Sequence, residues 1–378
     1  MNREMNLAFL FTRKISLKTW IDTGLFGREK LIYEKMIEDK FCSKVYWFTY
    51  GVDDHKYQKK LCTGIKVISM SKVFNSKVGI YIYSILLPFI HFKILSSVQM
   101  VKTNQMEGSW TAVLIKLLYG CKFYLRTGYT WSQLLEKSEK GSKLYKLSKI
   151  IEKVAYIYCD MASVSSFHNQ VYLQANYSFN FKKLFVLGNF IDTQLFSSSK
   201  PILKRDQESL LYIGRLNHEK NLKPLIESIA NLNLKLDIYG AGDQEKMLKS
   251  YTKELDASII FHGLVANEKL VDIYNSHKYY ILCSHAEGMP KTLIEAMSCA
   301  CICLGTDVEG INELIIDNKN GFLAFGVSTN DISLVIKRAL SCKETKEISK
   351  EARKLIHNSF SLDAVYQLEK SKIQECLS

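Results

Sequence analysis

The sequence predicts an α/β protein made of two doubly wound domains, each built on a parallel sheet. With 378 residues, the chain exceeds the size at which one hydrophobic core usually keeps growing. Short runs rich in β-branched and aromatic residues alternate with helical patterns, roughly every 20 to 30 residues, as βαβ units require. The alternation is interrupted around residues 189–206, where serines, a proline and charged residues are typical of a linker.

The first domain is expected over residues 1–190 and the second over residues 206–358. The strands predicted for the first domain are residues 7–12, 44–50, 65–70, 98–103, 122–127, 161–165 and 183–187. Those predicted for the second are residues 210–214, 234–240, 258–262, 279–284 and 301–305. The last amphipathic stretch, residues 362–378, is expected to pack back on the first domain. Because ligands of open α/β sheets bind beyond the carboxyl ends of the strands, two facing domains predict a central cleft.

The composition is that of a folded protein, with 47% hydrophobic and 24% charged residues. The ten cysteines do not have the paired spacing of a metal site. Cys299, Cys301 and Cys303 alternate along a strand-like run, as small hydrophobic residues do. These features predict a protein of the reducing cytoplasm without a structural metal.

The net charge of +13 is unevenly distributed along the chain. Residues 1–190 contain 28 Lys and Arg against 13 Asp and Glu, a balance of +15, whereas the remaining residues have a balance of −2. The first half therefore favours an anionic neighbour, which could be lipid head groups, nucleic acid or a phosphorylated substrate. Charge alone does not choose among the three.

Two segments of the first domain are candidates for contact with a membrane. Residues 78–95 are rich in Ile, Tyr and Leu, but Pro88, His91 and Lys93 interrupt them, which favours an amphipathic or core helix over a spanning one. Residues 142–158 place an apolar stripe beside several lysines on one helix. This second segment predicts a solvated lysine face or a peripheral position on an anionic membrane, such as the inner face of the cell membrane.

Two carboxylates, Glu287 and Glu295, flank a predicted loop-to-helix junction. Pro290 suits the first position of a helix, and Ala300 is expected to lie on its apolar side. Glu295 lies among hydrophobic residues, and a buried carboxylate is costly unless donors such as the hydroxyls of a ligand satisfy it. The backbone N–H groups of the intervening loop are expected to favour an anion at the helix N-terminus. An isolated pair at this spacing is more often a surface glutamate and a helix glutamate paired with a lysine.

A basic turn follows the first predicted strand of the second domain. It contains Gly214, Arg215 and Lys220, and Asn221 is placed to cap the next helix. A guanidinium fork and a mobile ammonium together suit the two phosphoryl groups of a diphosphate. Alone, the pattern is equally consistent with an ordinary strand and a basic turn.

Taken in order, these motifs resemble the family-four retaining glycosyltransferases, the glycosyl transferases group 1, which have the GT-B architecture of two Rossmann-like domains facing a central cleft. The resemblance covers nearly all of the second domain and rests on Gly214-Arg-Leu with Lys220-Asn, Tyr239-Gly-Ala-Gly-Asp243, Phe261-His-Gly263, Glu287-Gly-Met-Pro with Glu295-Ala-Met, and Gly305-Thr-Asp-Val-Glu-Gly310 with Asn320-Gly-Phe322. Asn189-Phe-Ile-Asp192 resembles the segment that ends the first domain in the family, with Phe190 in place of the usual glycine.

The resemblance implies that the second domain binds a nucleotide-diphosphate sugar and the first domain binds the acceptor. Arg215 and Lys220 would hold the diphosphate, Glu295 the ribose hydroxyls and Glu287 the hydroxyls of the transferred sugar. Catalysis would depend on Glu287, Arg215 and Lys220. The other donor-binding positions implied are Gly24, Gly27, Gly240, Gly242, Gly288, Met289, Pro290, Lys291, Thr292 and Leu293, with Arg126 as a candidate acceptor contact.

The implied activity is retaining transfer of a hexosyl or N-acetylhexosaminyl group to a saccharide or lipid-linked saccharide, in cell-surface polysaccharide biosynthesis. No Asp-x-Asp pair accompanies the phosphate-binding motifs, and Asp53 and Asp54 lie in a first-domain loop, so neither a metal nor another cofactor is expected. On this hypothesis, Glu287 positions the sugar and the departing phosphate oxygen helps to deprotonate the acceptor. The hypothesis fails if neighbouring side chains already neutralise the two carboxylates.

Two other functions remain open at this point. A hydrolysing sugar-nucleotide epimerase has the same two-domain shape, so the fold does not exclude it. A non-enzymatic basic protein that binds nucleic acid would also suit the charge of the first half, but the sequence contains no aromatic-basic recognition motif, and we expect no nucleic-acid partner. The glutamates do not select the donor base, the donor sugar or the acceptor.

Overall fold

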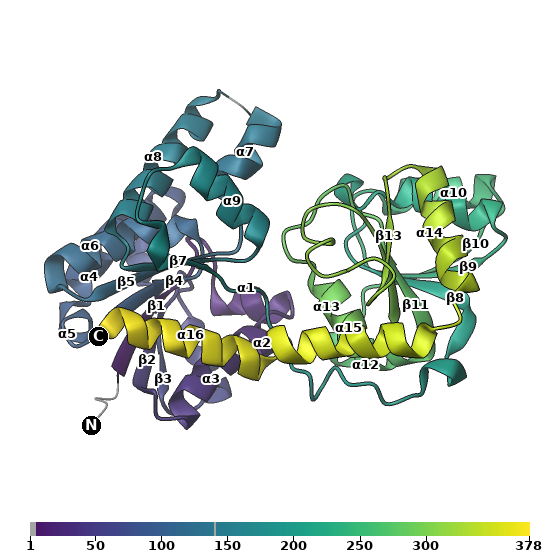
Figure 1. The fold of residues 1–378 in the computed structure, drawn as a ribbon. Coiled ribbons are helices and arrows are strands. Elements are labelled where there is room, and N and C mark those ends of the chain that lie inside the picture. The colour runs from purple at the N-terminus through teal and green to yellow at the C-terminus, as the bar shows by residue number, and fades with distance from the viewer. Residues whose placement is uncertain (1–4, 140) are drawn as a thin grey trace. The chain divides into compact units, whose positions relative to one another are not determined.

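The computed structural model of the protein describes residues 5–139 and 141–378, which divide into two compact units. Unit 1 contains the described residues up to Gly188 together with Tyr366–Ser378, and unit 2 is Asn189–Val365. Each unit has its own parallel sheet with helices packed on it (Figure 1). The two units are therefore separate α/β folds, as the alternation of strand and helix patterns predicts.

The sheet of unit 1 has the strand order β3-β2-β1-β4-β5-β6-β7 over the described residues. Its strands are β1 (Met5–Leu10), β2 (Cys42–Phe48), β3 (Ile65–Ile68), β4 (Met100–Thr103), β5 (Lys122–Thr127), β6 (Met161–Val164) and β7 (Leu184–Val186). All pairings are parallel, and the order reverses between β1 and β4. Such a reversal opens a crevice at the carboxyl ends of the two strands.

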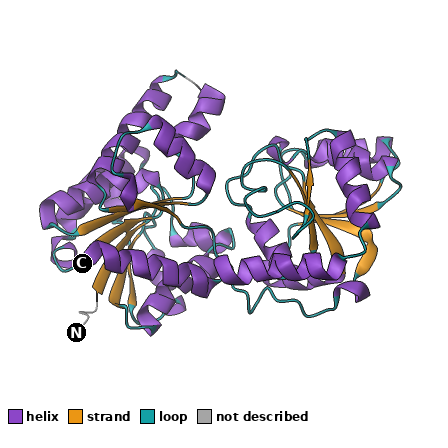
Figure 2. Cartoon of the chain, viewed as in Figure 1, coloured by secondary structure: helices purple, strands orange, loops and turns teal. Residues whose placement is uncertain are grey.

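The helices of unit 1 cover both faces of its sheet (Figure 2). They are α1 (Leu17–Asp22), α2 (Phe26–Glu29), α3 (Leu31–Glu38), α4 (Lys77–Ile90), α5 (Phe92–Leu95), α6 (Ser109–Tyr119), α7 (Trp131–Glu139), α8 (Lys143–Tyr158) and α9 (Phe167–Asn176). Short 3₁₀ turns lie at η1 (Asp54–Lys60), η2 (Lys72–Phe74), η3 (Met106–Gly108) and η4 (Phe181–Lys183).

The sheet of unit 2 has the order β10-β9-β8-β11-β12-β13 over the described residues, and reverses between β8 and β11. Its strands are β8 (Asp206–Ile213), β9 (Lys235–Tyr239), β10 (Ser258–Gly263), β11 (His277–Leu282), β12 (Ile302–Thr306) and β13 (Phe322–Ala324). Its helices are α10 (Leu222–Asn231), α11 (Glu245–Glu254), α12 (Asn267–Ser276), α13 (Lys291–Ser298), α14 (Thr329–Ser341) and α15 (Thr345–Ser359), with 3₁₀ turns η5 (Ile202–Lys204) and η6 (His218–Lys220). Cys299, Cys301 and Cys303 are buried in its core as small hydrophobic residues, but the predicted strand-like run is wrong for two of them, because Cys299 caps the end of α13 and Cys301 precedes β12.

Every strand predicted from the sequence overlaps a strand of the structure, and β13 is the strand that was missed. The stretch predicted as a linker is anchored to unit 2, because Ile191, Phe196 and Ile202 pack into its core, although residues such as Gln194 and Lys200 are exposed. Arg205, also in this stretch, is buried and donates to the carbonyl oxygens of Lys200, Tyr274 and Cys299. The interrupted pattern reflects irregular backbone that packs on unit 2 rather than a flexible connection.

The C-terminal helix α16 (Leu362–Leu377) starts in unit 2, and its residues from Tyr366 onward belong to unit 1. Lys102 on β4 donates to Glu369 on this helix at 2.5 Å, and both side chains are almost completely buried. Burial lowers the pKa of Lys102, while Glu369 opposes that shift. A buried pair of this kind fixes the register of the helix on the sheet, since either partner alone would leave an uncompensated charge.

Helices α4 and α8 leave much of their apolar surface exposed. The face of α8 that is buried carries Ser148, Glu152, Ala155 and Tyr156, so the apolar stripe predicted from the sequence faces outward instead. Exposed large hydrophobic residues on the two helices are Val78, Tyr81, Ile82, Ile85, Leu86, Phe89, Ile90, Leu144, Leu147, Ile150, Val154, Ile157 and Tyr158. Among the described helices, none has the length and apolarity needed to span a bilayer.

Candidate functional site

Of the predicted donor residues of unit 2, the charged ones lie after β8 and β11, on the two loops and on α13, whereas Gly240 and Gly242 follow β9. Strands β8 and β11 are parallel neighbours in the middle of the sheet, at the point where the strand order reverses. The β8 loop carries Arg215 and Lys220, and the β11 loop carries Glu287 and leads into α13. The fold thus brings two motifs separated by many residues to the edge where α/β sheets bind their ligands.

Lys220 and Glu287 are in direct contact. The Lys220 Nζ donates to Glu287 Oε1 at 2.5 Å, and the Ser284 hydroxyl donates to the same oxygen at 2.6 Å. Both side chains of the ion pair are largely buried, so the contact is screened less than a surface pair. Glu287 is therefore neutralised by a neighbour, which is the condition stated above against the hypothesis. The neighbour, however, is Lys220, itself a predicted donor residue. The charges of Lys220 and Glu287 cancel, so the pair adds no net charge to the site. The hydrogen bond from Ser284 is an interaction that the sequence motif did not indicate.

Glu295 lies in the first turns of α13 and is buried. The Tyr274 hydroxyl donates to Glu295 Oε2 at 3.0 Å and to the carbonyl oxygen of Thr292 at 3.2 Å. Burial, with Glu295 beside it, raises the pKa of Tyr274 well above its usual value, so this hydroxyl stays protonated and remains a donor. Tyr280 donates in turn to the Thr292 hydroxyl at 2.7 Å. The two buried tyrosines hold the start of α13 in place.

The N-terminus of α13 has no side-chain cap. Pro290 occupies the position just before the helix, one residue earlier than predicted, and its carbonyl accepts the first intrahelical bond from Ile294. The first N–H groups of a helix have no partner within it and carry the positive end of the helix dipole. The helix ends at Ser298. The expectation that Ala300 belongs to it is therefore wrong, and Ala300 has a φ of +61°. The start of α13 therefore offers backbone donors to an anion.

Arg215 and Asn217 lie on the same loop as Lys220. The Arg215 side chain is exposed and forms no ion pair with another described residue, while its carbonyl oxygen accepts from Tyr212 at 2.9 Å. Asn217 Oδ1 is buried without a hydrogen-bond partner among the described residues. Asn221 precedes α10 but does not cap it, since it adopts a φ of +54° and its side chain donates to the Val327 carbonyl. Arg215 is thus a cation available to a ligand, and Asn217 is a further polar group that the motif did not single out.

Gly240 and Gly242 are required by the packing of the chain itself. A Cβ at Gly240, whose φ is +138°, would overlap the carbonyl oxygen of Gly214, and one at Gly242 would overlap the backbone of Leu216. The Leu216 N–H donates to Ala241 across the same turn. These contacts explain both glycines as parts of a close approach between two loops, the alternative that the sequence also allowed.

Gly310 shapes the other loop of the site. It has a φ of +77°, and a Cβ there would collide with the carbonyl oxygens of Glu287 and Gly288. The Asn189 amide donates to the carbonyl of Met289 at 2.9 Å, on the neighbouring stretch of this loop. Met289 itself is buried, whereas Gly288 is exposed. Backbone packing therefore fixes the loop that carries Glu287.

The candidate residues of unit 1 come from two places in the sequence, the segment of α1 and α2 and the strand β5, and Arg126 on β5 lies close enough to Glu29 of α2 to feel its charge. Gly24 is in the short loop between α1 and α2, and Gly27 is inside α2, with no atom within 4 Å of a Cβ at either position. Arg126 ends β5, where its backbone N–H donates to Thr103 at 3.1 Å. Burial opposes the charge of Arg126, but Glu29 and neighbouring tyrosines outweigh burial and raise its pKa. Arg126 therefore keeps its positive charge.

Residues 195–355, which lie within unit 2, match the family model for glycosyl transferases group 1. The chain is similar to the GalNAc-α-(1→4)-GalNAc-α-(1→3)-diNAcBac-PP-undecaprenol α-1,4-N-acetyl-D-galactosaminyltransferase of Campylobacter jejuni. The two are 32% identical over 197 residues, and this matched region covers 49% of this chain and 53% of that protein. The chain spans about half the length of the curated relatives it matches.

The fold is similar to that of solved glycosyltransferases along nearly the whole chain. Sucrose-phosphate synthase from Thermosynechococcus elongatus superposes with a TM-score of 0.75 at 14% identity and covers 99% of both chains. HepE from Anabaena, solved in complex with UDP, has a TM-score of 0.75 at 14% identity and covers 98% of this chain and 100% of that one. Residues 195–355 are therefore similar to the glycosyl transferases group 1, and the chain has the two-domain α/β fold of the solved GT-B glycosyltransferases.

Proposed function

We propose that the protein is a retaining, metal-independent glycosyltransferase. It moves a hexosyl or N-acetylhexosaminyl group from a nucleotide-diphosphate sugar to a saccharide or lipid-linked saccharide in cell-surface polysaccharide biosynthesis. The relative from Campylobacter jejuni, whose name specifies an undecaprenol-linked acceptor, supports a lipid-linked substrate. The donor class is supported by the UDP complex of HepE.

The observation that carries the proposal is the contact between Lys220 and Glu287 beside the uncapped start of α13. A diphosphate placed there would meet the ammonium of Lys220, the guanidinium of Arg215 and the N–H groups at the start of α13. As the phosphate approaches Lys220, it competes with Glu287 for the ammonium. Glu287 is then released toward the hydroxyls of the sugar, and Glu295 is left to accept from the ribose.

On the resemblance to the family-four retaining glycosyltransferases, Glu287 is assigned the role of a positioning group rather than a covalent nucleophile. In the structure, Glu287 Oε1 accepts from both the Lys220 ammonium and the Ser284 hydroxyl. The proposed step is a displacement on one face of the sugar. The bond from the anomeric carbon to the phosphate oxygen breaks, the acceptor oxygen bonds to that carbon, and the acceptor proton passes to the departing phosphate. Cations and the helix dipole stabilise the charge that develops on the diphosphate.

Residues of unit 1 are proposed to serve the acceptor, with the protein positioned at the cytoplasmic face of a membrane. The exposed apolar residues of α4 and α8 lie close in sequence to lysines, among them Lys143, Lys146 and Lys153. An anionic membrane attracts such a surface, and each basic residue near it contributes on the order of 1 kcal/mol.

The experiment that tests the proposal is a thermal-shift panel of UDP-, GDP- and ADP-sugars, followed by product analysis with the donor that binds. Binding to the native state raises the unfolding temperature. We expect stabilisation by one donor class and a new glycosidic bond in the product. An epimerised free sugar would identify the hydrolysing epimerase instead, and stabilisation by none of the donors would contradict both assignments. Activity that survives treatment with EDTA is expected for a metal-independent enzyme.

A further inference from the structure

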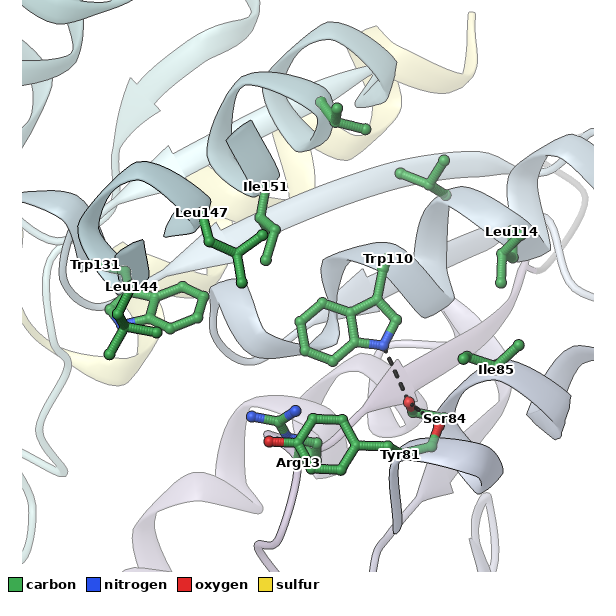
Figure 3. A pocket seen from close by; sticks show the side chains of 12 residues that line it. Arg13, Tyr81, Ser84, Ile85, Trp110, Leu114, Trp131, Leu144, Leu147 and Ile151 are labelled. Atoms are coloured by element: carbon green, nitrogen blue, oxygen red, sulfur yellow. Dashed lines mark hydrogen bonds between the residues drawn. The ribbon is translucent and has the colours of Figure 1, made fainter. Parts of the chain in front are cut away.

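Unit 1 contains an apolar pocket that is separate from the candidate donor site. Its volume is about 660 Å³, within the range of pockets that bind small molecules. The walls come from α4, α6, α7 and α8, with Tyr81, Trp110, Trp131, Leu147 and Ile151 among them (Figure 3). The two polar groups of Trp110 and Ser84 are already engaged with each other, since the Trp110 Nε1 donates to the Ser84 hydroxyl at 3.1 Å. A pocket with such an apolar lining favours the binding of a hydrocarbon group.

The pocket begins at the point where the strand order of the first sheet reverses. Arg13, one of its lining residues, follows β1, and the partner of Arg13, Glu107, follows β4. β1 and β4 are the neighbouring strands at the reversal. This is the location at which doubly wound sheets bind their ligands, so the pocket has the position of a binding site as well as the volume.

Arg13 is the one charged residue among the described residues that line the pocket. Its side chain is only 9% exposed, lies 3.9 Å from the ring centroid of Tyr81, and donates through one Nη to Glu107 at 3.0 Å. Its Nε is buried and has no hydrogen-bond partner among the described residues. An unpaired buried donor is unfavourable, and a guanidinium binds phosphate oxygens well. Arg13 therefore favours an anionic group of a ligand whose remainder is apolar.

The surroundings of the pocket fit an amphipathic anion. Leu144 and Leu147 line it and are also exposed to solvent, so the apolar wall continues onto the outer face of α8. The exposed lysines Lys143, Lys146 and Lys153 lie on the same helix. Hydrocarbon inside, a guanidinium at the sheet and exposed lysines on helix α8 together complement an anionic lipid.

We propose that this pocket binds the aliphatic chain of an anionic lipid, with the lipid phosphate on Arg13. The identification of that lipid as the glycosyl acceptor rests on the proposed function, whereas the binding itself does not. The occupant is a single lipid molecule held between helices, which differs from adsorption of the exposed face of α8 on a bilayer. The two are distinguishable, because they depend on different residues of one helix.

The first experiment measures binding of hexyl, octyl and decyl phosphate to the full-length protein by calorimetry, below their micelle concentrations. Burial of one methylene contributes about 0.8 kcal/mol, so affinity should rise about fourfold for each methylene added. Inorganic phosphate should not bind measurably, and decanol should bind about tenfold or more weakly than decyl phosphate because it lacks the charge that Arg13 recognises. Equal affinity across the series would overturn the proposal.

The second experiment compares Leu147→Gln with Ile150→Gln. Both residues are on α8 and exposed, at 49% and 61%, but only Leu147 is among the pocket-lining residues. Leu147→Gln should weaken binding of decyl phosphate about fivefold or more, and Ile150→Gln should leave it unchanged. Arg13→Gln should abolish the preference for decyl phosphate over decanol while the chain-length dependence persists. Equal losses in Leu147→Gln and Ile150→Gln would indicate surface adsorption and refute the pocket.

The same samples are titrated with the nucleotide sugar that the thermal-shift panel identifies. A wild-type unfolding temperature for unit 1 in Leu147→Gln shows that the unit with the pocket is folded, so a loss of decyl phosphate binding is then local to the pocket. Pocket-dependent lipid binding without any donor binding would leave the pocket assignment intact and refute the glycosyltransferase assignment. Donor binding without any dependence of alkyl phosphate affinity on chain length would refute the pocket assignment and leave the glycosyltransferase assignment intact.

Discussion

At the scale of the residue, Lys220 and Arg215 are assigned the same ligand but differ in their surroundings. Lys220 is held by Glu287, whereas Arg215 is exposed and unpaired among the described residues. We predict that Arg215→Ala lowers kcat/KM for transfer about 10²-fold, because a donor to the developing phosphate charge is lost. The unfolding temperature should stay at the wild-type value. Steady-state kinetics with the identified donor check this, and wild-type kinetics in the variant would count against the assigned role.

Lys220→Ala removes the same ligand contact and also leaves Glu287 without its cation. We therefore expect a loss of transfer of at least about 10²-fold together with a measurable loss of stability, since a largely buried carboxylate remains unpaired. The double change Lys220→Ala with Glu287→Gln should recover stability but not transfer. Wild-type transfer by Lys220→Ala would contradict the role assigned to Lys220.

Glu227 provides a titration that can be followed through stability. The hydroxyl of Thr329, at 2.5 Å, and that of Tyr251 donate to its carboxylate, and these bonds lower its pKa from the ordinary 4.5. A lowered folded pKa stabilises the protein above pH 4.5, and that stability is lost as the pH falls through the folded value. Urea titrations between pH 6 and pH 3 should show a smaller acid loss in Glu227→Gln than in wild type. The difference should be at most about 1 kcal/mol, because the carboxylate is only partly buried.

At the scale of the element, the turn after β9 depends on a residue without a side chain. Gly240→Ala would force a Cβ against the Gly214 carbonyl at a φ of +138° and should destabilise the protein by about 1–3 kcal/mol. Gly27→Ala is the matched control, because it lies inside α2 with open space around it and should be neutral or slightly stabilising. Urea unfolding of both variants measures the contrast. Equal stability would show that the loop yields to the added methyl group.

The strands of both sheets were predictable from sequence because each central strand is a run of apolar residues buried on two faces, such as residues 279–282 in β11. β13 has only three residues, Phe322–Ala324, and follows an irregular segment, so its periodicity is too short to detect. The failed cap at Asn221 has another cause. Its side chain bonds to the Val327 carbonyl, a partner distant in sequence that no local pattern shows.

The candidate site was predictable as residue types but not as contacts. The motifs identified Lys220 and Glu287, yet their pairing spans 67 positions and depends on β8 and β11 lying side by side. Ser284 and Tyr274 were not identified, because a serine and a buried tyrosine carry no distinctive local signal. The exposed apolar face of α8 was predicted as a stripe, but its direction follows from Glu152, which the Ser132 N–H and the Tyr177 hydroxyl satisfy in the interior.

The helix that closes the chain makes a second element-scale prediction. Glu369→Gln leaves the ammonium of Lys102 buried without its counter-charge, and should destabilise unit 1 by about 3–5 kcal/mol. Lys370, on the same helix, forms a more exposed ion pair with Asp39, which follows α3. Lys370→Gln removes this pair and should change stability by no more than about 1 kcal/mol. Chemical denaturation distinguishes the two, and similar small effects in both would mean that water enters to solvate Lys102.

At the scale of the whole molecule, two units with separate cores are expected to unfold in two calorimetric transitions. The proposed donor residues that contact one another all lie in unit 2, so a nucleotide sugar should raise only the transition of that unit. At a concentration one hundred times Kd, the added stability is about 2.7 kcal/mol. Glu369→Gln identifies the other transition independently, because its effect belongs to unit 1. If the donor instead raised the transition that Glu369→Gln lowers, the donor would bind in unit 1, and the roles assigned to Arg215, Lys220 and Glu287 would have to be abandoned.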